Sequence, residues 1–361
     1  MTIPTRYDTP VILAWVLFLC SACSGPQSDI PVESINLERI EKFDSAVPGF
    51  NGLIAQVADL EIDAEKRIYI LDSTERHVLV IDSTRTVVNI IGGDGDGPGE
   101  IRIFLHSSNH HLAVGGGYIV VGSDPNLIHV FDMEGNFLKR FTPHLRVCDL
   151  DVRDDGTIIT HTYDSETPII EYDNQGNTHR EYGRAVIRTG MGDTQYPQFN
   201  RRNKGTLNLL PGDELITFNS DWIWLGHYRG EELQSETMID LEELILIAVP
   251  TRYNLKLVRP MMKTIRQHNP EIINRAAESR TLNQDDFPGM STLFSIRTDT
   301  VRGETWGFFG MRLWQLTTDG QVLRVFECEE GGSFHFSIRD GYIVFGAGAS
   351  IAVGNIPSRP N

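Results

Sequence analysis

An all-β fold, specifically a six-bladed β-propeller, is predicted by three features of this 361-residue sequence. Short apolar runs alternate with polar residues and are separated by turn residues, as in half-buried strands. These runs form units of four that recur at roughly 40 to 50 residues, a spacing typical of propeller blades. Gly-containing pairs lie between successive runs, where hairpin turns are expected. A chain of this length can form one large β domain without a second.

Three units are the clearest. They run from Val57 to Ile91, from His111 to Phe141 and from Val147 to Tyr182. In the third, the runs CDLDV and TIITHTY flank an Asp-Gly turn, and the runs IIEYD and THREY flank a Gln-Gly turn. Each of these units therefore predicts one four-stranded blade.

Three further units complete the predicted circle. The fourth, from Thr206 to Ile239, is the most diverged, and the fifth extends from Leu293 to Glu327. The sixth, from Phe334 to Asn355, supplies only three strands. We expect the alternating segment from Ile35 to Phe43 to add its fourth strand and to close the circle, because closure protects sheet edges. The predicted domains are a signal peptide (1–22), a tether (23–34), the propeller (35–356) and a tail (357–361).

The interval from Arg252 to Leu282 breaks the period and predicts two short helices before blade five. Pro260 suits the first position of one helix, and Asn269 followed by Pro270 suits the start of the other. This interval is also basic, with seven Lys or Arg against two Glu from Arg252 to Arg280. It is either a helical hairpin packed on the propeller or a lid that docks a partner.

The N-terminal residues predict export. Arg6 precedes an apolar run from Val11 to Leu19, and small residues then lead to Cys23, the order found in secretory signal peptides. The run is too short to span a membrane as a helix. Ser-Ala-Cys resembles the end of a bacterial lipobox, which makes Cys23 the predicted lipidation site. Cleavage by ordinary signal peptidase after Ala22 is the alternative.

Charge and cysteine content exclude two classes of protein. The net charge of −17 argues against nucleic-acid partners, since binding DNA or RNA needs a basic surface. After export, Cys148 and Cys328 are the cysteines left in the folded body, which is too few for a disulfide framework. We interpret both as small buried hydrophobic residues.

The chain resembles the six-bladed β-propeller lipoproteins of bacteria, which are relatives of the NHL-repeat propellers. The resemblance rests on the stretch GDGDGPGE from Gly93 to Glu100, the Asp-Gly turns at Asp155 and Asp319, and the pair Trp306 and Trp314. It extends over nearly the whole mature chain. What it implies is a fold and an envelope location, not a reaction.

Two local motifs do not predict metal sites. The stretch that begins at Asp94 starts like an EF-hand loop, but Pro98 takes the place of an oxygen ligand and Leu105 the place of the final Glu. The cluster of His106, His110 and His111 does not suit one ion either, because adjacent strand residues point to opposite faces. The motifs of zinc proteases and serine hydrolases are absent from the sequence.

The central channel is the candidate site, because the first strand of every blade contributes polar residues to it. Such groups could bind a polar ligand or a divalent cation, or they could simply contact water in the channel. The residues selected as binding candidates are Asp59, His111, Asp149, Asn208 and His335, with Glu61, Asp151, Ser295 and Ser337 also expected along the channel.

The leading functional hypothesis is a monomeric, membrane-tethered propeller that has no catalytic residues and no cofactor and binds an envelope protein or a small polar ligand. The alternative is a metal-dependent hydrolase of the lactonase-type propeller class, with a divalent cation held by some of the five binding candidates Asp59, His111, Asp149, Asn208 and His335. A lyase of the peptide-amidating type would need a zinc site and a positioned arginine, and the sequence locates neither.

Overall fold

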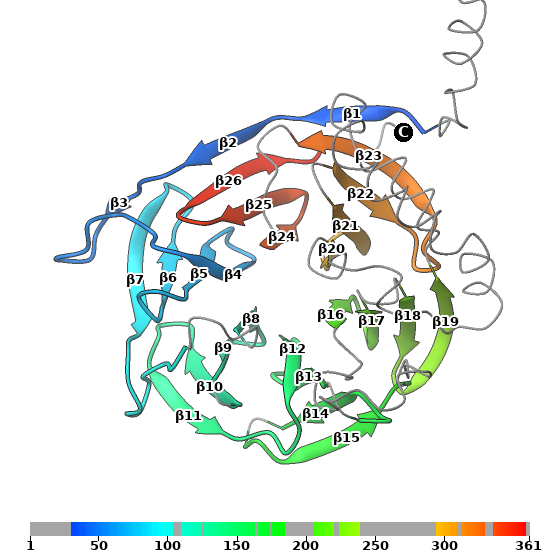
Figure 1. Ribbon diagram of the computed structural model, residues 1–361, viewed down its shortest axis with the longest axis horizontal. Helices are drawn as coiled ribbons and strands as arrows, with labels where there is room; N and C mark the ends of the chain where they lie inside the picture. The colour runs from blue at the N-terminus through cyan, green and yellow to red at the C-terminus, as the bar shows by residue number, and fades with distance from the viewer. Residues whose placement is uncertain are drawn as a thin grey trace, which may run out of the picture.

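The computed structural model describes residues 30–103, 110–124, 126–162, 165–173, 175–184, 205–219, 224–238, 294–309, 312–328 and 335–358. In this part of the chain all helix and strand assignments are strands, and they form six separate sheets. Figure 1 shows the sheets arranged like blades around a central axis. The predicted six-bladed propeller is therefore confirmed.

Each blade has four consecutive strands, except that the last strand of blade six comes from the N-terminal region. Blade one contains β4 (Val57–Ile62), β5 (Ile68–Asp72), β6 (His77–Ile81) and β7 (Thr86–Gly92). Blade two contains β8 (His111–Gly115), β9 (Tyr118–Ser123), β10 (Leu127–Asp132) and β11 (Phe137–Phe141). Blade three contains β12 (Val147–Val152), β13 (Ile158–Thr162), β14 (Ile169–Tyr172) and β15 (Thr178–Tyr182).

The other three blades follow the same order. Blade four contains β16 (Gly205–Leu210), β17 (Glu214–Asn219), β18 (Trp224–Arg229) and β19 (Glu232–Met238). Blade five contains β20 (Phe294–Asp299), β21 (Glu304–Phe309), β22 (Arg312–Leu316) and β23 (Val322–Cys328). Blade six contains β24 (His335–Arg339), β25 (Tyr342–Ala347) and β26 (Ser350–Asn355).

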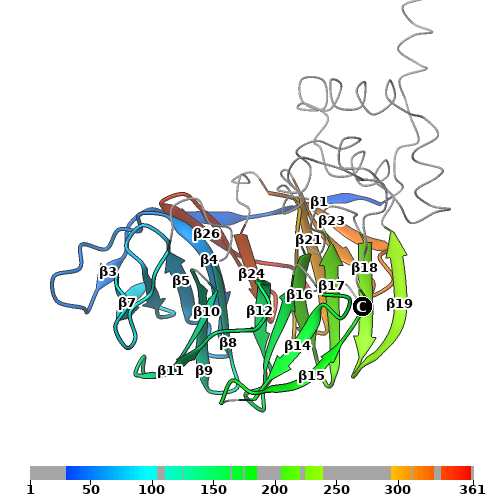
Figure 2. The same cartoon turned by 60° about the horizontal axis from the view of Figure 1, so that its bottom comes forward.

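The first strands of the six blades form the inner ring. Each of these strands, from β4 through β24, contacts the first strand of the next blade, and β24 contacts β4. The circle is thus closed on its inner side. The hairpins between first and second strands all lie at one end of the channel, because all six first strands run in the same direction (Figures 1 and 2).

The N-terminal segment forms a belt of three short strands on the outside of three blades. β2 (Leu37–Ile40) pairs antiparallel with β26 and completes blade six, as predicted. β1 (Val32–Ile35) adds in parallel to β23 of blade five, and β3 (Asp44–Ser45) adds in parallel to β7 of blade one. Figure 1 shows this belt crossing the outer strands of the three blades. The sequence predicted a single strand in this segment. The pairings of β1 with β23 and of β3 with β7 were not predicted.

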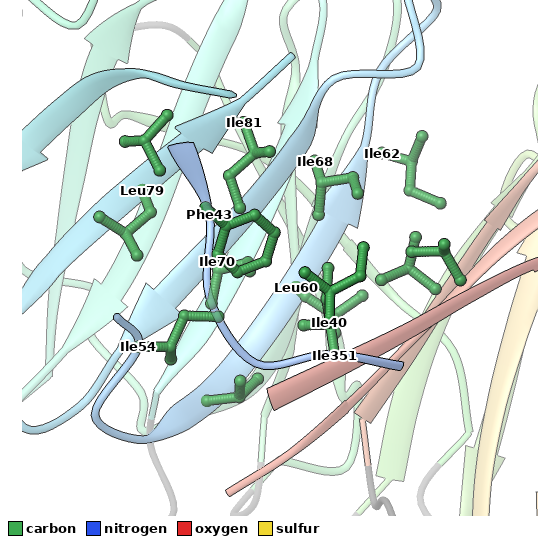
Figure 3. Close-up of a cluster of buried hydrophobic side chains, with 14 residues drawn as sticks. Ile40, Phe43, Ile54, Leu60, Ile62, Ile68, Ile70, Leu79, Ile81 and Ile351 are labelled. Atoms are coloured by element: carbon green, nitrogen blue, oxygen red, sulfur yellow. The ribbon is translucent and has the colours of Figure 1, made fainter. Parts of the chain in front are cut away.

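The hydrophobic core is divided into clusters that lie between neighbouring blades. One cluster joins blades six and one and takes in Ile40 and Phe43 from the belt (Figure 3). Another joins blades five and six and contains Ile35 of the belt with the fully buried Trp306. Separate clusters join blades one and two, blades two and three, and blades three and four. The belt therefore contributes apolar side chains to both clusters at the closure of the ring.

Some predictions fall on residues that the structure does not describe. The expected signal peptide, Cys23 and the expected helical insertion at 252–282 lie outside the described residues. Within the described ranges, no helix is long and apolar enough to cross a membrane. Cys148 and Cys328 are both buried free thiols. Cys148 also contacts His161, with Sγ 2.8 Å from Nδ1, so it is more than a small hydrophobic residue.

Candidate binding site in the central channel

Polar side chains in the channel are arranged in levels, because alternate residues of a strand share one face. The first level contains Asp59, His111, Asp149 and His335 from four different inner strands. Two residues further along the same or neighbouring inner strands, the second level contains Glu61, Asp151, Asn208, Arg297 and Ser337. The third level, at the hairpin end, includes Asp63, Arg153 and Arg339. The sequence pattern alone thus places charged groups from all sides around one axis.

Arg297, on β20, connects the first two levels. Its Nη2 donates to Asp59 Oδ1 at 3.3 Å, and its Nε lies 3.9 Å from Glu61 Oε1. Its Nη1 lies 4.0 Å from Asp149 Oδ2 across the channel. The Arg297 side chain is only 13% exposed, so these interactions are poorly screened by water. One guanidinium therefore faces carboxylates from blades one and three at the same time.

The channel carboxylates also join neighbouring blades through backbone hydrogen bonds. Asp59 Oδ2 in blade one accepts a hydrogen bond from Leu112 N in blade two at 2.9 Å. Asp149 Oδ2 in blade three accepts one from Leu207 N in blade four at 2.8 Å. Asp151 Oδ2 makes the same kind of bond with Leu209 N at 3.1 Å. These carboxylates therefore hold the inner ring together. The sequence had also allowed the alternative that the channel side chains contact only water, and that alternative does not include these bonds.

Burial shifts the protonation equilibria of this cluster. Desolvation raises the pKa of Glu61 to about 8 and that of Asp149 to about 7, with Arg297 acting in the opposite direction. Burial lowers the pKa of His111 to about 4, although the charge of Asp59 opposes the shift. Burial by itself would lower the pKa of Arg297, but the surrounding carboxylates raise it. At neutral pH the imidazole is thus uncharged, Glu61 holds a proton, and Arg297 is cationic.

A cavity of about 940 Å³ opens above the second level at the hairpin end of the channel. Its floor is formed by the second-level residues Glu61, Asp151, Asn208, Arg297 and Ser337. Ser337 Oγ donates a 2.8 Å hydrogen bond to Glu61 Oε2, which fixes one oxygen of that carboxyl group. All six blades contribute to the lining of the cavity. The first-level residues are not part of this lining and lie behind its floor.

The wall of the cavity is charged, and most of its arginines have carboxylate partners. Arg67 pairs with Asp63 at 2.6 Å. Arg153 and Arg180 both pair with Glu171, which is almost fully buried. Of the arginines that the structure describes in this wall, Arg339 is the exception.

Arg339 lies at the end of β24 and lines the cavity. Among the described residues, its one polar contact is Thr300 Oγ1 at 3.5 Å, and no carboxylate lies within ion-pair distance of it. Its Nε is buried and has no hydrogen-bond partner in the described part of the chain. Within the described ranges, Arg339 is therefore the lining arginine that no carboxylate neutralises.

The structure brings four of the five predicted candidates together. His111 Nδ1 lies 3.5 Å from Asp149 Oδ1, and His335 Nδ1 lies 3.9 Å from Asp59 Oδ1. Asn208 lies on the cavity floor and is separate from these four. Arg297 was missed, although Ser295 was recognised two residues earlier on the same strand. The alternation that selected Ser295 also places Arg297 on the channel face.

Metal coordination by the predicted residues has no support in this geometry. Among the described residues, no group of three or more His, Cys, Asp or Glu has an arrangement that could hold a metal ion. The carboxylates that would serve as ligands are bonded to Arg297 and to backbone amides instead. His110 pairs with Asp124 at 3.2 Å, away from His111, and His106 lies outside the described residues. Arg297 is a positioned arginine, but the described residues place no zinc ligand set beside it.

Comparison with known proteins does not assign this chain to a family. No protein-family model matches the chain, and no curated protein matches it significantly. Among solved structures, it is similar to a protein of Bacteroides fragilis described as exported, with 12% identity, a TM-score of 0.49, and 92% of this chain and 98% of that chain covered. It is also similar to virginiamycin B lyase from Staphylococcus aureus, with 10% identity, a TM-score of 0.49, and 90% and 100% coverage.

A third similar structure is BamB from Moraxella catarrhalis, with 10% identity, a TM-score of 0.43, and 91% of this chain and 98% of that chain covered. Similarities at this level carry no argument about ligand, partner or reaction. The function has to be argued from the channel and the cavity themselves.

Proposed function

We propose that this chain is an exported, lipid-anchored binding protein whose cavity holds a small polar ligand. The observation that carries the proposal is the cavity of about 940 Å³ above the polar channel floor. Its size falls in the range of small-molecule sites, which is about 300 to 1,000 Å³. The ring of six blades makes the floor rigid, because its side chains come from strands that are fixed on both sides.

The ligand is polar because the floor is polar. Glu61, Asn208, Arg297 and Ser337 face the cavity, and a ligand without hydrogen-bonding groups would desolvate them without satisfying their remaining donors and acceptors. Binding is favoured over metal-assisted hydrolysis because Arg297 lies between the carboxylates that a metal would need. The geometry thus supports recognition of a ligand by prearranged polar groups.

The anchor is proposed from the sequence. Arg6, the apolar run from Val11 to Leu19 and the final Cys23 have the order of a lipoprotein signal peptide. Cys23→Ala is expected to abolish incorporation of labelled palmitate and to release the protein from membranes. Palmitate labelling that persists in Cys23→Ala, or the absence of any label in the unmodified protein, would contradict lipidation at this residue.

The cavity is tested by retention of small molecules. The purified protein is incubated with a polar metabolite extract and desalted, and the retained compounds are identified by mass spectrometry. Asn208→Leu keeps a similar volume but removes the amide from the floor. Gln234→Leu makes the same kind of exchange at an exposed position on β19 of the same blade.

The proposal predicts a compound that is retained by the unmodified protein and by Gln234→Leu but is lost from Asn208→Leu. Circular dichroism should show the same β spectrum for all three proteins. If no compound is retained, or if retention is the same in both variants, the cavity is not the binding site and the proposed function is wrong.

A further inference from the structure

We infer that the ligand is a zwitterion of the size of a dipeptide, with its ammonium group at the cavity floor and its carboxylate at Arg339. This inference rests on the proposed function and specifies the chemistry of the same site. It follows from two unbalanced charges at different depths of the cavity and from the spacing between them.

The floor lacks positive charge. Arg297 faces Asp59, Glu61, Asp149 and Asp151, and among the described residues only Asp151 has a second arginine, Arg153, acting on it. These four carboxyl groups come from two strands, β4 and β12. Asp59, Asp149 and Asp151 each accept backbone hydrogen bonds that partly satisfy their oxygens. A ligand that brings a cation to the floor would reduce this excess of acidic groups.

Glu61 is the acidic group of the floor that accepts no backbone hydrogen bond in the described part of the chain, so a ligand can reach its oxygens. Its side chain is 24% exposed, and among the described residues its oxygens have one hydrogen bond, from Ser337, and a 3.9 Å contact with Arg297 Nε. Burial first, and then the charges of Asp59 and Asp151, raise the pKa of Glu61 to about 8, against the effect of Arg297. An ammonium group on Glu61 would favour the ionised carboxylate, so that binding releases a proton at pH 7.

The rim lacks negative charge at one place. Arg339 lines the cavity without a carboxylate partner among the described residues, whereas Arg67, Arg153 and Arg180 are each paired. A guanidinium with free donors is well suited to a carboxylate, which it can bind with two parallel hydrogen bonds.

The spacing of the two charges selects the ligand size. Arg339 lies two residues beyond Ser337 on β24, and Ser337 contacts Glu61. Two residues of a strand rise by about 7 Å. The backbone of an extended dipeptide also spans about 7 Å, which places its two ends at the two charged levels. A single amino acid is too short to reach both levels at once.

The test uses glycylglycine and two analogues that each lack one charge. N-acetylglycylglycine has no ammonium group, and glycylglycinamide has no carboxylate. Isothermal titration calorimetry at pH 7 with the full mature chain should show that each analogue binds at least about tenfold more weakly than glycylglycine, because a charged hydrogen bond is lost.

Two variants assign each charge to its residue. In Arg339→Gln the preference for glycylglycine over the amide should disappear, while the preference over the acetylated analogue remains. In Glu61→Gln the opposite pattern is expected. Asp154→Asn, an exposed residue of the same cavity lining, is the matched control and should keep both preferences.

Proton release gives a readout that does not depend on affinity alone. The binding heat of the unmodified protein should change with the ionisation enthalpy of the buffer, and Glu61→Gln should remove this dependence. If glycylglycine does not bind, or if it binds no better than its analogues, the zwitterion inference is wrong. The proposed function would still stand if another compound were retained by the cavity and lost from Asn208→Leu.

Discussion

Replacing Arg297 with Gln should destabilise the propeller more than the loss of any exposed ion pair. The guanidinium is 13% exposed and faces Asp59, Glu61 and Asp149 at 3.3, 3.9 and 4.0 Å. Glutamine retains a polar side chain but removes the charge, so that the acidic groups lose their cation. They must then either repel each other or take up protons.

The expected cost follows from this geometry. Breaking a buried pair by removing one partner costs about 3–5 kcal/mol. At neutral pH Glu61 is protonated and Asp149 is partly so, since their pKa values are raised to about 8 and about 7. The loss should therefore lie near the lower limit, at about 3 kcal/mol at pH 7. For a domain of more than 300 residues, with an unfolding entropy of about 2.1 cal/mol/K per residue, that corresponds to a decrease in Tm of about 4–5 °C.

The cost should increase with pH. Without Arg297 the carboxyl groups hold their protons more strongly, so the folded variant binds more protons than the unmodified protein. Stability then falls as pH rises through the titration of these groups. The difference in unfolding free energy between Arg297→Gln and the unmodified protein should be smaller at pH 5 than at pH 8.5.

Urea unfolding followed by circular dichroism at pH 5, 7 and 8.5 measures this difference. Arg229→Gln is the control, because Arg229 pairs with Glu214 while its own side chain is 66% exposed, and the loss of such an exposed pair costs about 1 kcal/mol or less. Arg297→Lys, which keeps the charge, should be less destabilised than Arg297→Gln at pH 8.5. A loss in Arg297→Gln that equals the loss in Arg229→Gln at every pH would refute the reasoning.

Three further predictions concern other parts of the fold. Ile35 is a buried residue of the belt, and Ile35→Ala should cost about 2–5 kcal/mol of stability in chemical denaturation. Val32 is 44% exposed in the same strand, and Val32→Ala should change stability by less than about 0.5 kcal/mol. Asp299 accepts the backbone N–H groups of Asp340 and Gly341 with its two separate oxygens, and the amide of an asparagine has only one oxygen. Asp299→Asn should therefore cost about 1–3 kcal/mol of stability and speed hydrogen exchange at Asp340 and Gly341. Burial lowers the pKa of His129 to about 4, so the folded state binds fewer protons than the unfolded state and stability is lost as pH falls from about 6.5 to 4. His129→Gln should reduce that loss, measured by urea unfolding at pH 4.5 and 7, and an unchanged slope would contradict this assignment.

The blades were predictable because their hairpins have distinctive residues. Gly156 and Gly320 follow Asp in two of the predicted turns, and both adopt φ of +85°, which glycine reaches without steric cost. The alternating runs on either side then fixed the strand register, since a slip of one residue would expose the apolar side chains. The fourth strand of blade six was also predictable, because that blade had only three strands of its own.

The remaining features depend on contacts that local patterns do not encode. β1 and β3 are four and two residues long and pair in parallel with strands that are distant in the sequence. The alternation of β20 indicated which of its residues face the channel, but not that Arg297 would meet Asp59, a residue 238 positions away. The cavity likewise forms only when residues from all six blades come together around the channel. Its paired and unpaired arginines therefore became visible only in three dimensions.

The belt has a consequence for the order of folding. Arg324 in blade five donates to Glu33 in the belt across 291 positions of the chain, and β2 pairs with the last strand of blade six. A ribosome releases the belt first, but its partners emerge only at the end of synthesis. Contacts between residues so distant in sequence form slowly, since a long loop must close before they contribute. Translocation across a membrane during synthesis would thus be completed before the ring could lock, and a truncated chain would leave the belt without a partner.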